Sequence, residues 1–119
     1  MGRALAERYP VARRVFEDAD RVLGFALSAL CFEGPAEDLT RTENTQPALL
    51  VTSVAAFRVL EEKGLLPSAT AGHSAGEYAA NVAAGSLSFE DALRLIRLRG
   101  EAMAGAGTER PGTMAAVLG

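Results

Sequence analysis

Apolar residues recur at helical spacing along most of the chain and divide it into a series of predicted helices. Residues 3–23 follow this spacing with a break before Pro10. Because proline is favoured in the first turn of a helix, we predict that a second helix begins there. The pattern stops at Gly24, a residue type that commonly ends helices. Residues 35–39 have room for one short helical turn.

The longest uncharged stretch predicts a buried helix in the middle of the chain. Residues 47–63 have helical spacing, a glycine follows them, and no charged residue occurs at positions 48–56. A helix that is apolar around most of its circumference is usually buried. We therefore expect the central core helix here, with Pro47 in its first turn and Asn44 or Thr45 as its N-cap.

The second half of the chain combines helices with short strand signals. Helices are expected at residues 77–84 and 88–104, the second with two acidic residues in its first turn, where they complement the helix dipole. Residues 69–71 and 113–118 are predicted as short strands, and residues 105–112 as a loop. This order indicates an α/β fold of which only part of the sheet is present.

Composition and charge narrow the class of protein. The 119 residues, 49% hydrophobic and 23% charged, suit one small globular domain. A net charge of −3 with interspersed signs gives no indication of a nucleic-acid or membrane partner. No apolar run approaches the ~20 residues of a membrane span, and no targeting segment is recognisable. Cys31 is the single cysteine and has apolar neighbours, so we expect a buried, unreactive thiol in a cytoplasmic protein.

One motif carries candidate chemistry. Residues 72–76 read Gly-His-Ser-Ala-Gly, a G-x-S-x-G pattern between a predicted strand end and a predicted helix. In this pattern the serine lies on a tight turn that exposes its hydroxyl, and the glycines leave room for neighbouring backbone. The amide of Ala75 and the helix N-terminus can then stabilise an oxyanion. The motif predicts Ser74 as a nucleophile. The simpler interpretation is a glycine-rich turn in which Ser74 only caps the helix.

His73 is the only histidine of the chain. A general base must come within hydrogen-bonding distance of the serine hydroxyl, and adjacent residues on such a turn point in different directions. We therefore exclude a Ser74–His73 pair and expect His73 to line the site or to pack beneath the turn. The chain then offers no candidate base for Ser74.

Arg99 has an unusual position on its predicted helix. On a helical wheel of residues 89–103 it falls at the edge of the apolar face, whereas four other charged residues, among them Arg97, fall on the opposite side. A buried arginine is costly without an anionic partner. The side chain either extends to solvent or forms a structural ion pair, or it binds a substrate carboxylate in bidentate fashion.

Several segments, in this order and spacing, carry a resemblance to a known family. Residues 45–49 read Thr-Gln-Pro-Ala-Leu, residues 72–77 read Gly-His-Ser-Ala-Gly-Glu, and residues 98–100 read Leu-Arg-Gly. Glu-Gly-Pro at 33–35 and Thr-Met-Ala-Ala-Val-Leu-Gly at 113–119 also fit. Together they resemble the malonyl-CoA:acyl carrier protein transacylases of bacterial fatty-acid synthesis and the related acyltransferase domains of polyketide synthases. The resemblance covers the whole chain.

The resemblance implies a role for each candidate residue. Ser74 would be the nucleophile that becomes malonylated, and the amide of Ala75 would supply one oxyanion-hole donor. Arg99 would bind the malonyl carboxylate, which accounts for its position on the wheel, and Gln46 and His73 would line the pocket. The implied reaction is a ping-pong transfer from malonyl-CoA to the phosphopantetheine thiol of acyl carrier protein. No metal or redox cofactor is implied, and the full-length protein would be a monomer.

The resemblance also implies a fold and its limits. Residues 1–112 would belong to a large, hydrolase-like α/β subdomain with a parallel sheet, and residues 113–119 would be the first strand of a smaller, ferredoxin-like subdomain. Family members are considerably longer, begin with a strand and a Gly-Gln-Gly-Ser-Gln-like loop, and carry their catalytic histidine downstream. We therefore expect an N-terminal-half fragment with little or no turnover by itself.

Three alternatives stay open at this point. An α/β-hydrolase esterase or lipase shares the serine motif but leaves residues 45–49 and Arg99 unexplained. A fragment of a polyketide synthase acyltransferase domain would share every motif. The chain could also be a truncated, non-catalytic product. Malonyl is the family's default acyl group, and the sequence does not separate it from methylmalonyl.

Overall fold

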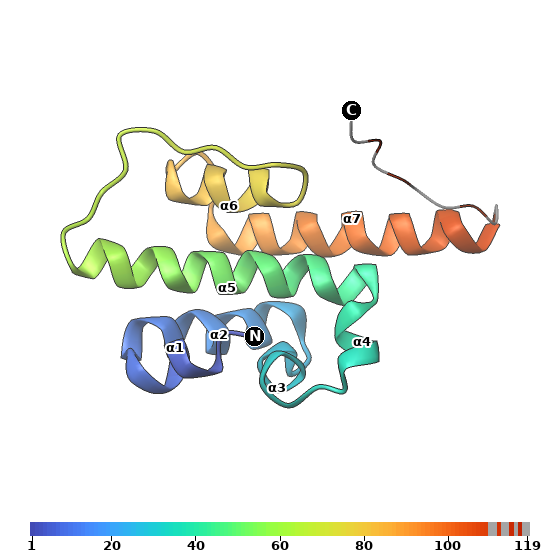
Figure 1. Cartoon of the computed structure of the whole chain (residues 1–119), viewed down its shortest axis with the longest axis horizontal. Helices are drawn as coiled ribbons and strands as arrows, with labels where there is room; N and C mark the ends of the chain where they lie inside the picture. Colours follow the sequence, from blue (N-terminus) through green and yellow to red (C-terminus); the bar gives the residue numbers. More distant parts are fainter. Residues whose placement is uncertain (110–111, 113–114, 116, 118–119) are drawn as a thin grey trace.

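Helices form all the regular secondary structure of the described residues, and the long helix α5 lies at their centre (Figure 1). The computed structural model describes residues 1–109, 112, 115 and 117. Figure 1 shows α5 between α1, α2 and α3 on one side and α6 and α7 on the other. The helices are α1 (Arg3–Arg8), α2 (Pro10–Leu23), α3 (Leu27–Glu33), α4 (Ala36–Thr40), α5 (Thr42–Glu62), α6 (Gly76–Ala83) and α7 (Phe89–Glu109).

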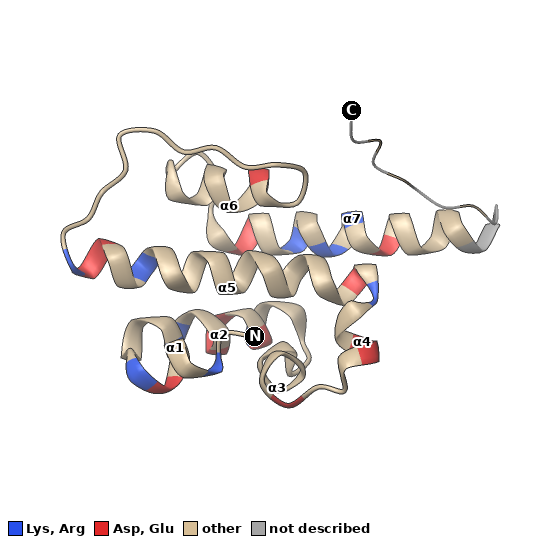
Figure 2. Cartoon of the chain, in the orientation of Figure 1, with Lys and Arg blue, Asp and Glu red and all other residues tan. Residues whose placement is uncertain are grey.

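The expectation of a central core helix is confirmed. On α5, Leu50, Val51 and Val54 are each at most 1% exposed. They are buried on two sides because α2 and α7 both pack against α5. Figure 2 shows charged residues of both signs spread over the other helices, while the middle of α5 carries none. The absence of charge at positions 48–56 therefore reflects burial between two groups of helices.

In the first half of the chain, most helices begin and end close to the predicted residues. Pro10 is the first residue of α2, and Gly24 follows the helix with φ 75°, the left-handed conformation that favours glycine. The short helix α4 falls on the predicted turn at residues 35–39, starting at Ala36. Helix α3 was not predicted, because seven residues are too few for a clear period.

The start of α5 differs from the prediction. The helix begins at Thr42, so Asn44 and Thr45 lie inside it and the prediction that either is its N-cap is wrong. Their side chains bind α4 instead: Asn44 Nδ2 donates to the carbonyl of Asp38 at 2.9 Å, and Thr45 Oγ1 donates to the carbonyl of Leu39. These two side chains therefore hydrogen-bond to carbonyl groups of α4 and do not cap α5.

Pro47 lies in the interior of α5 rather than in its first turn. Proline has no N–H, so the carbonyl of Glu43, four residues earlier, cannot receive its usual helical hydrogen bond. That carbonyl accepts a hydrogen bond from Arg97 Nη1 of α7 at 2.9 Å. A side chain from the neighbouring helix therefore satisfies the carbonyl group that Pro47 leaves unpaired.

Helix α7 starts as predicted and ends later. Ser88 Oγ accepts the backbone N–H of Asp91 at 3.1 Å, which is N-cap geometry. The helix continues to Glu109, so the prediction of a loop from residue 105 is wrong for residues 105–109. Glycine costs only about 1 kcal/mol in a helix interior, so the two glycines of this segment, Gly105 and Gly107, do not end the helix.

The predicted strand at residues 69–71 is not formed, and the described residues contain no strand. A strand needs a neighbour to satisfy its backbone N–H and C=O groups, and this part of the chain supplies none. The segment is instead part of an irregular connection from α5 to α6 (Figure 1). Most of the strand predicted at 113–118 lies outside the described residues, so the division at residue 112 stays a prediction.

Cys31 is buried in the core, 3% exposed, and this burial raises the pKa of its thiol. A raised pKa reduces the thiolate fraction at neutral pH, as expected for an unreactive cysteine.

None of the helices within the described residues combines the length and the hydropathy that crossing a bilayer requires.

Candidate active site

Ser74 lies on a strained turn directly before α6. Its φ is 53°, and among the described residues it is the only non-glycine residue with a positive φ. Such a conformation costs free energy and is concentrated at functional sites. Hydrogen bonds from the amide of Gly76 to the carbonyl of His73 (2.9 Å) and from Glu77 to Ser74 (3.1 Å) close the turn and begin the helix. The sequence motif thus forms the tight turn that it predicts.

The two glycines of the motif have different steric roles. A Cβ added to Gly72 would lie 2.1 Å from the carbonyl oxygen of Gly76 and 2.5 Å from the backbone nitrogen of Glu77. No side chain fits there, because backbone atoms cannot move away as a flexible side chain can. A Cβ on Gly76 would meet nothing within 4 Å. Of these two glycines, Gly72 alone is required by the packing of the described residues.

Arg99 of α7 donates a hydrogen bond to the candidate nucleophile. Its Nη2 lies 2.9 Å from Ser74 Oγ, and its Nη1 donates to Oε1 of Gln46 on α5. Three elements far apart in sequence thus meet at one point. The helical wheel placed Arg99 at the edge of an apolar face, and the structure shows it half-buried there.

Gln46 is held in place on both of its amide atoms. It is 5% exposed, and its Nε2 donates to Thr42 Oγ1 at 2.8 Å and to Met103 Sδ at 3.3 Å. With Nε2 donating to these two partners, Oε1 is the atom that faces Arg99. The roles of Thr42 and Met103 were not predicted. Thr42 lies four residues before Gln46, so helical spacing would have indicated the first contact if the start of α5 had been placed correctly.

The interpretation of Arg99 as half of a structural ion pair is not supported. Its partners among the described residues are a hydroxyl and an amide oxygen, both neutral. By contrast, Arg94 pairs with Glu90 and Asp91, and Arg97 pairs with Glu101. Among the described residues, the positive charge of Arg99 therefore lies beside the serine hydroxyl with no carboxylate to neutralise it.

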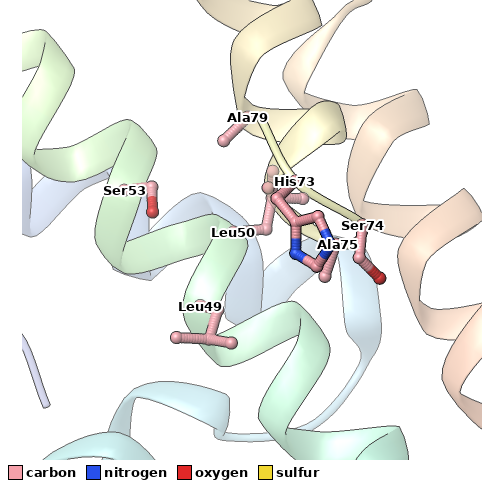
Figure 3. A pocket seen from close by; sticks show the side chains of 8 residues that line it. Leu49, Leu50, Ser53, His73, Ser74, Ala75 and Ala79 are labelled. Atoms are coloured by element: carbon pink, nitrogen blue, oxygen red, sulfur yellow. The ribbon is translucent and has the colours of Figure 1, made fainter. Parts of the chain in front are cut away.

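His73 and Ser74 both line a pocket beside the turn (Figure 3). The pocket has a volume of about 320 Å³ and lies between α5 and the start of α6; its lining residues are Leu49, Leu50, Ser53, His73, Ser74, Ala75, Gly76 and Ala79. No hydrogen bond joins the imidazole to the Ser74 hydroxyl in the described part of the chain. Gln46 does not line this pocket.

The remaining groups around Ser74 define what the site can do. The amide of Ala75, at the N-terminus of α6, donates to no acceptor among the described residues and is available to an oxyanion. No histidine or carboxylate within residues 1–109 is hydrogen-bonded to Ser74 Oγ. Clusters of three or more potential metal ligands are absent from the described residues. The arrangement therefore combines a candidate nucleophile, a free backbone amide beside it and a guanidinium within hydrogen-bonding distance of the hydroxyl.

The sequence of this chain matches a family of known proteins. Residues 1–118 match the family described as acyl transferase domain. The chain is 54% identical over 119 residues to the malonyl CoA-acyl carrier protein transacylase of Bacillus subtilis, covering all of this chain and 38% of that protein. It is 48% identical over 120 residues to the polyketide biosynthesis protein ThaF of Burkholderia thailandensis, of which it covers 10%.

Solved structures agree with the sequence comparison. The MCAT of Streptococcus pneumoniae superposes with a TM-score of 0.86 at 45% identity, over 89% of this chain and 34% of that one. A malonyl-transacylase in complex with its type II PKS acyl-carrier protein gives 0.84 at 50% identity, over 89% and 35%. The chain thus spans little more than a third of these proteins. Since the family match extends over nearly every residue, the chain belongs to the acyl transferase domain family.

Proposed function

We propose that the protein carrying this chain transfers a malonyl group from CoA to the phosphopantetheine thiol of an acyl carrier protein, in fatty-acid biosynthesis. The observation that carries the proposal is the Arg99 guanidinium, which lies 2.9 Å from Ser74 Oγ and has no carboxylate partner among the described residues. The relative from Bacillus subtilis is named for this reaction, and another relative forms a complex with an acyl-carrier protein.

In the proposed first half-reaction, Ser74 Oγ attacks the thioester carbonyl of malonyl-CoA and passes its proton to a general base. The amide of Ala75 and the N-terminus of α6 stabilise the oxyanion of the tetrahedral intermediate. The C–S bond then breaks, CoA leaves as a thiol after it takes up a proton, and Ser74 holds the malonyl group as an ester.

In the second half-reaction, the phosphopantetheine thiol of the carrier protein loses its proton to the same base and attacks the malonyl ester. The thioester forms, and Ser74 Oγ leaves and is reprotonated. No histidine or carboxylate among the described residues is hydrogen-bonded to Ser74 Oγ, so we propose that the base is a histidine from another part of the full-length protein, as in the family that the sequence resembles. We expect the 119-residue chain alone to have little or no turnover.

Arg99 would select the acyl group by binding its carboxylate. A planar guanidinium binds a carboxylate through two parallel hydrogen bonds, and Gln46 holds one edge of the guanidinium in position. His73 and the pocket beside it would border the space next to the ester. The proposed site contains no metal or redox cofactor.

The selective role of Arg99 can be tested by acylation of the intact protein that carries this chain. Arg99→Ala should lower the rate constant for acylation by malonyl-CoA about ten- to a hundredfold, because a hydrogen-bonded charged group is lost. Acylation by acetyl-CoA, which lacks the carboxylate, should change much less. Equal losses with both substrates would contradict a carboxylate-binding role and would favour a general effect on Ser74.

Polyketide biosynthesis is the second candidate process, and the 48% identity to ThaF supports it. The chemistry at Ser74 would be the same and only the acceptor would differ. Transfer to holo carrier proteins from fatty-acid and polyketide systems, measured in parallel with the intact protein, separates the two. An esterase is disfavoured, because the chain belongs to the acyl transferase domain family.

We propose the finer description of the fold on the same basis. Residues 1–112 would be part of the large α/β subdomain, with its parallel sheet completed by other parts of the full-length protein, and residues 113–119 would begin the ferredoxin-like subdomain. The similarity to MCAT structures of which the chain covers about a third supports this division. The proposed protein is monomeric and acts in the cytoplasm, on CoA and carrier-protein thioesters.

A further inference from the structure

We propose that Arg97 is a positioning residue for the proposed acyl-group selection. It fixes the first turns of α5 against α7, and thereby keeps Gln46 in place to orient Arg99. The inference rests on the proposed function, because its consequence is the binding of a carboxylated acyl group. Arg97 itself contacts neither Ser74 nor Arg99 among the hydrogen bonds of the described residues.

Two hydrogen bonds join Arg97 to α5. Its Nη1 donates to the carbonyl of Glu43 at 2.9 Å and to Asn44 Oδ1 at 3.0 Å. The Glu43 carbonyl is available because Pro47 has no N–H to donate to it. Pro47 therefore leaves an unpaired carbonyl on the side of α5 that faces α7, and Arg97 donates a hydrogen bond to it.

The Arg97 side chain is itself held in one orientation. Nε donates to Glu101 Oε1 at 2.6 Å, one turn further along α7, and the guanidinium lies 5.2 Å from the ring centroid of Phe25. The side chain is 27% exposed. A charged group with fixed partners on three sides is a better positioning element than an exposed surface arginine, whose contacts are weak.

The same turn of α5 carries Thr42, one of the residues that hold Gln46. Thr42 accepts the Gln46 Nε2 donor, and Gln46 Oε1 accepts from Arg99. The helices approach closely here: a Cβ on Gly100 would lie 2.7 Å from Glu43 Cα and 3.0 Å from the carbonyl oxygen of Thr42. A small shift of this turn would move Gln46 relative to Arg99, and misplacement by about 1 Å can cost up to about a hundredfold in rate.

The test compares acylation of the intact protein by malonyl-CoA and by acetyl-CoA. Arg97→Met removes the hydrogen bonds and keeps much of the side-chain length. We expect the ratio of malonyl to acetyl acylation rate constants to fall about tenfold. Arg97→Lys keeps one charged donor and should restore part of the ratio. Arg94→Met is the matched control. Arg94 lies on the same helix, and its ion-pair partners within the described residues are Glu90 and Asp91 of that helix, so the ratio of this variant should stay unchanged.

A double-mutant cycle tests whether Arg97 acts through Gln46. If it does, Arg97→Met should lower the ratio little further in a Gln46→Leu background, since the contact it supports is already lost. Additive losses would overturn the inference. So would a ratio that Arg97→Met leaves unchanged. If Arg97→Met does not fold, Arg97→Lys decides, because a single nitrogen replaces the guanidinium that contacts both Glu43 and Glu101, and an unchanged ratio there overturns the proposal.

The outcomes also separate this inference from the proposed function. If Arg99→Ala lowers the ratio and Arg97→Met does not, only the positioning role is wrong. If Arg99→Ala leaves the ratio unchanged, the carboxylate-binding role of Arg99 fails, and the inference about Arg97 fails with it.

Discussion

At the scale of single residues, the site contains groups whose conformation or environment costs free energy, as is common at functional sites. Ser74 has a positive φ, and Arg99 is half-buried without a carboxylate partner among the described residues. The sequence predicted both residues as candidates, the first from the G-x-S-x-G motif and the second from the helical wheel. It did not predict that the two side chains touch, because the periodicity of one helix says nothing about which residues of another segment it meets.

The position of Arg97 shows the same limit more clearly. The wheel placed it with the charged residues on the outer side of its helix, yet its guanidinium turns back to α5. A long side chain can reach around the helix to an unpaired carbonyl, and the Glu43 carbonyl is unpaired within α5 because Pro47 has no N–H. Neither fact follows from the pattern of either helix alone.

The turn before Ser74 leads to a prediction about Gly72. Gly72→Ala should destabilise the intact protein by about 2 kcal/mol or more, because the added Cβ would overlap the backbone at Gly76. Urea unfolding followed by circular dichroism measures the free energy of unfolding. Gly76→Ala is the matched control, with nothing within 4 Å of its Cβ, and should change that free energy little. A loss for Gly72→Ala as small as for this control would contradict the described turn.

At the scale of elements, helices with many apolar positions were predicted well and short or unpartnered segments were not. The uncharged stretch at 48–56 identified α5, and the break at Pro10 identified the start of α2. Helix α3 is too short to show a period, and the start of α5 was hidden because Asn44 and Thr45 bind α4 carbonyls. The strand predicted at 69–71 has no neighbour to pair with in the described residues.

The central position of α5 predicts which of its residues determine stability. Leu50 is 1% exposed, so Leu50→Ala should lower the free energy of unfolding of the intact protein by about 2–5 kcal/mol through lost burial and a cavity. Glu62→Ala, at the exposed end of the same helix, should change it by about 0.5 kcal/mol or less. Chemical unfolding of both variants measures the difference. Equal losses would contradict the placement of α5 in the core.

At the scale of the whole molecule, the described residues leave several large apolar side chains on the surface. Leu65 and Leu66, in the connection before the Ser74 turn, are 59% and 71% exposed, and Leu98 beside Arg99 is 63% exposed. Exposed apolar patches of this kind are typical of surfaces that another part of a protein covers. The chain spans 38% of the relative from Bacillus subtilis, so its chemistry is best examined in the intact protein.

The proposed reaction requires Ser74 to form an ester with the malonyl group, and mass spectrometry can detect that ester directly. The intact protein is incubated with malonyl-CoA without carrier protein, and its mass and its peptides are then determined by mass spectrometry. We predict one added malonyl group, located on the peptide that contains Ser74 and absent from a folded Ser74→Ala variant. An unmodified protein, or an adduct that persists in Ser74→Ala, would contradict malonylation of Ser74.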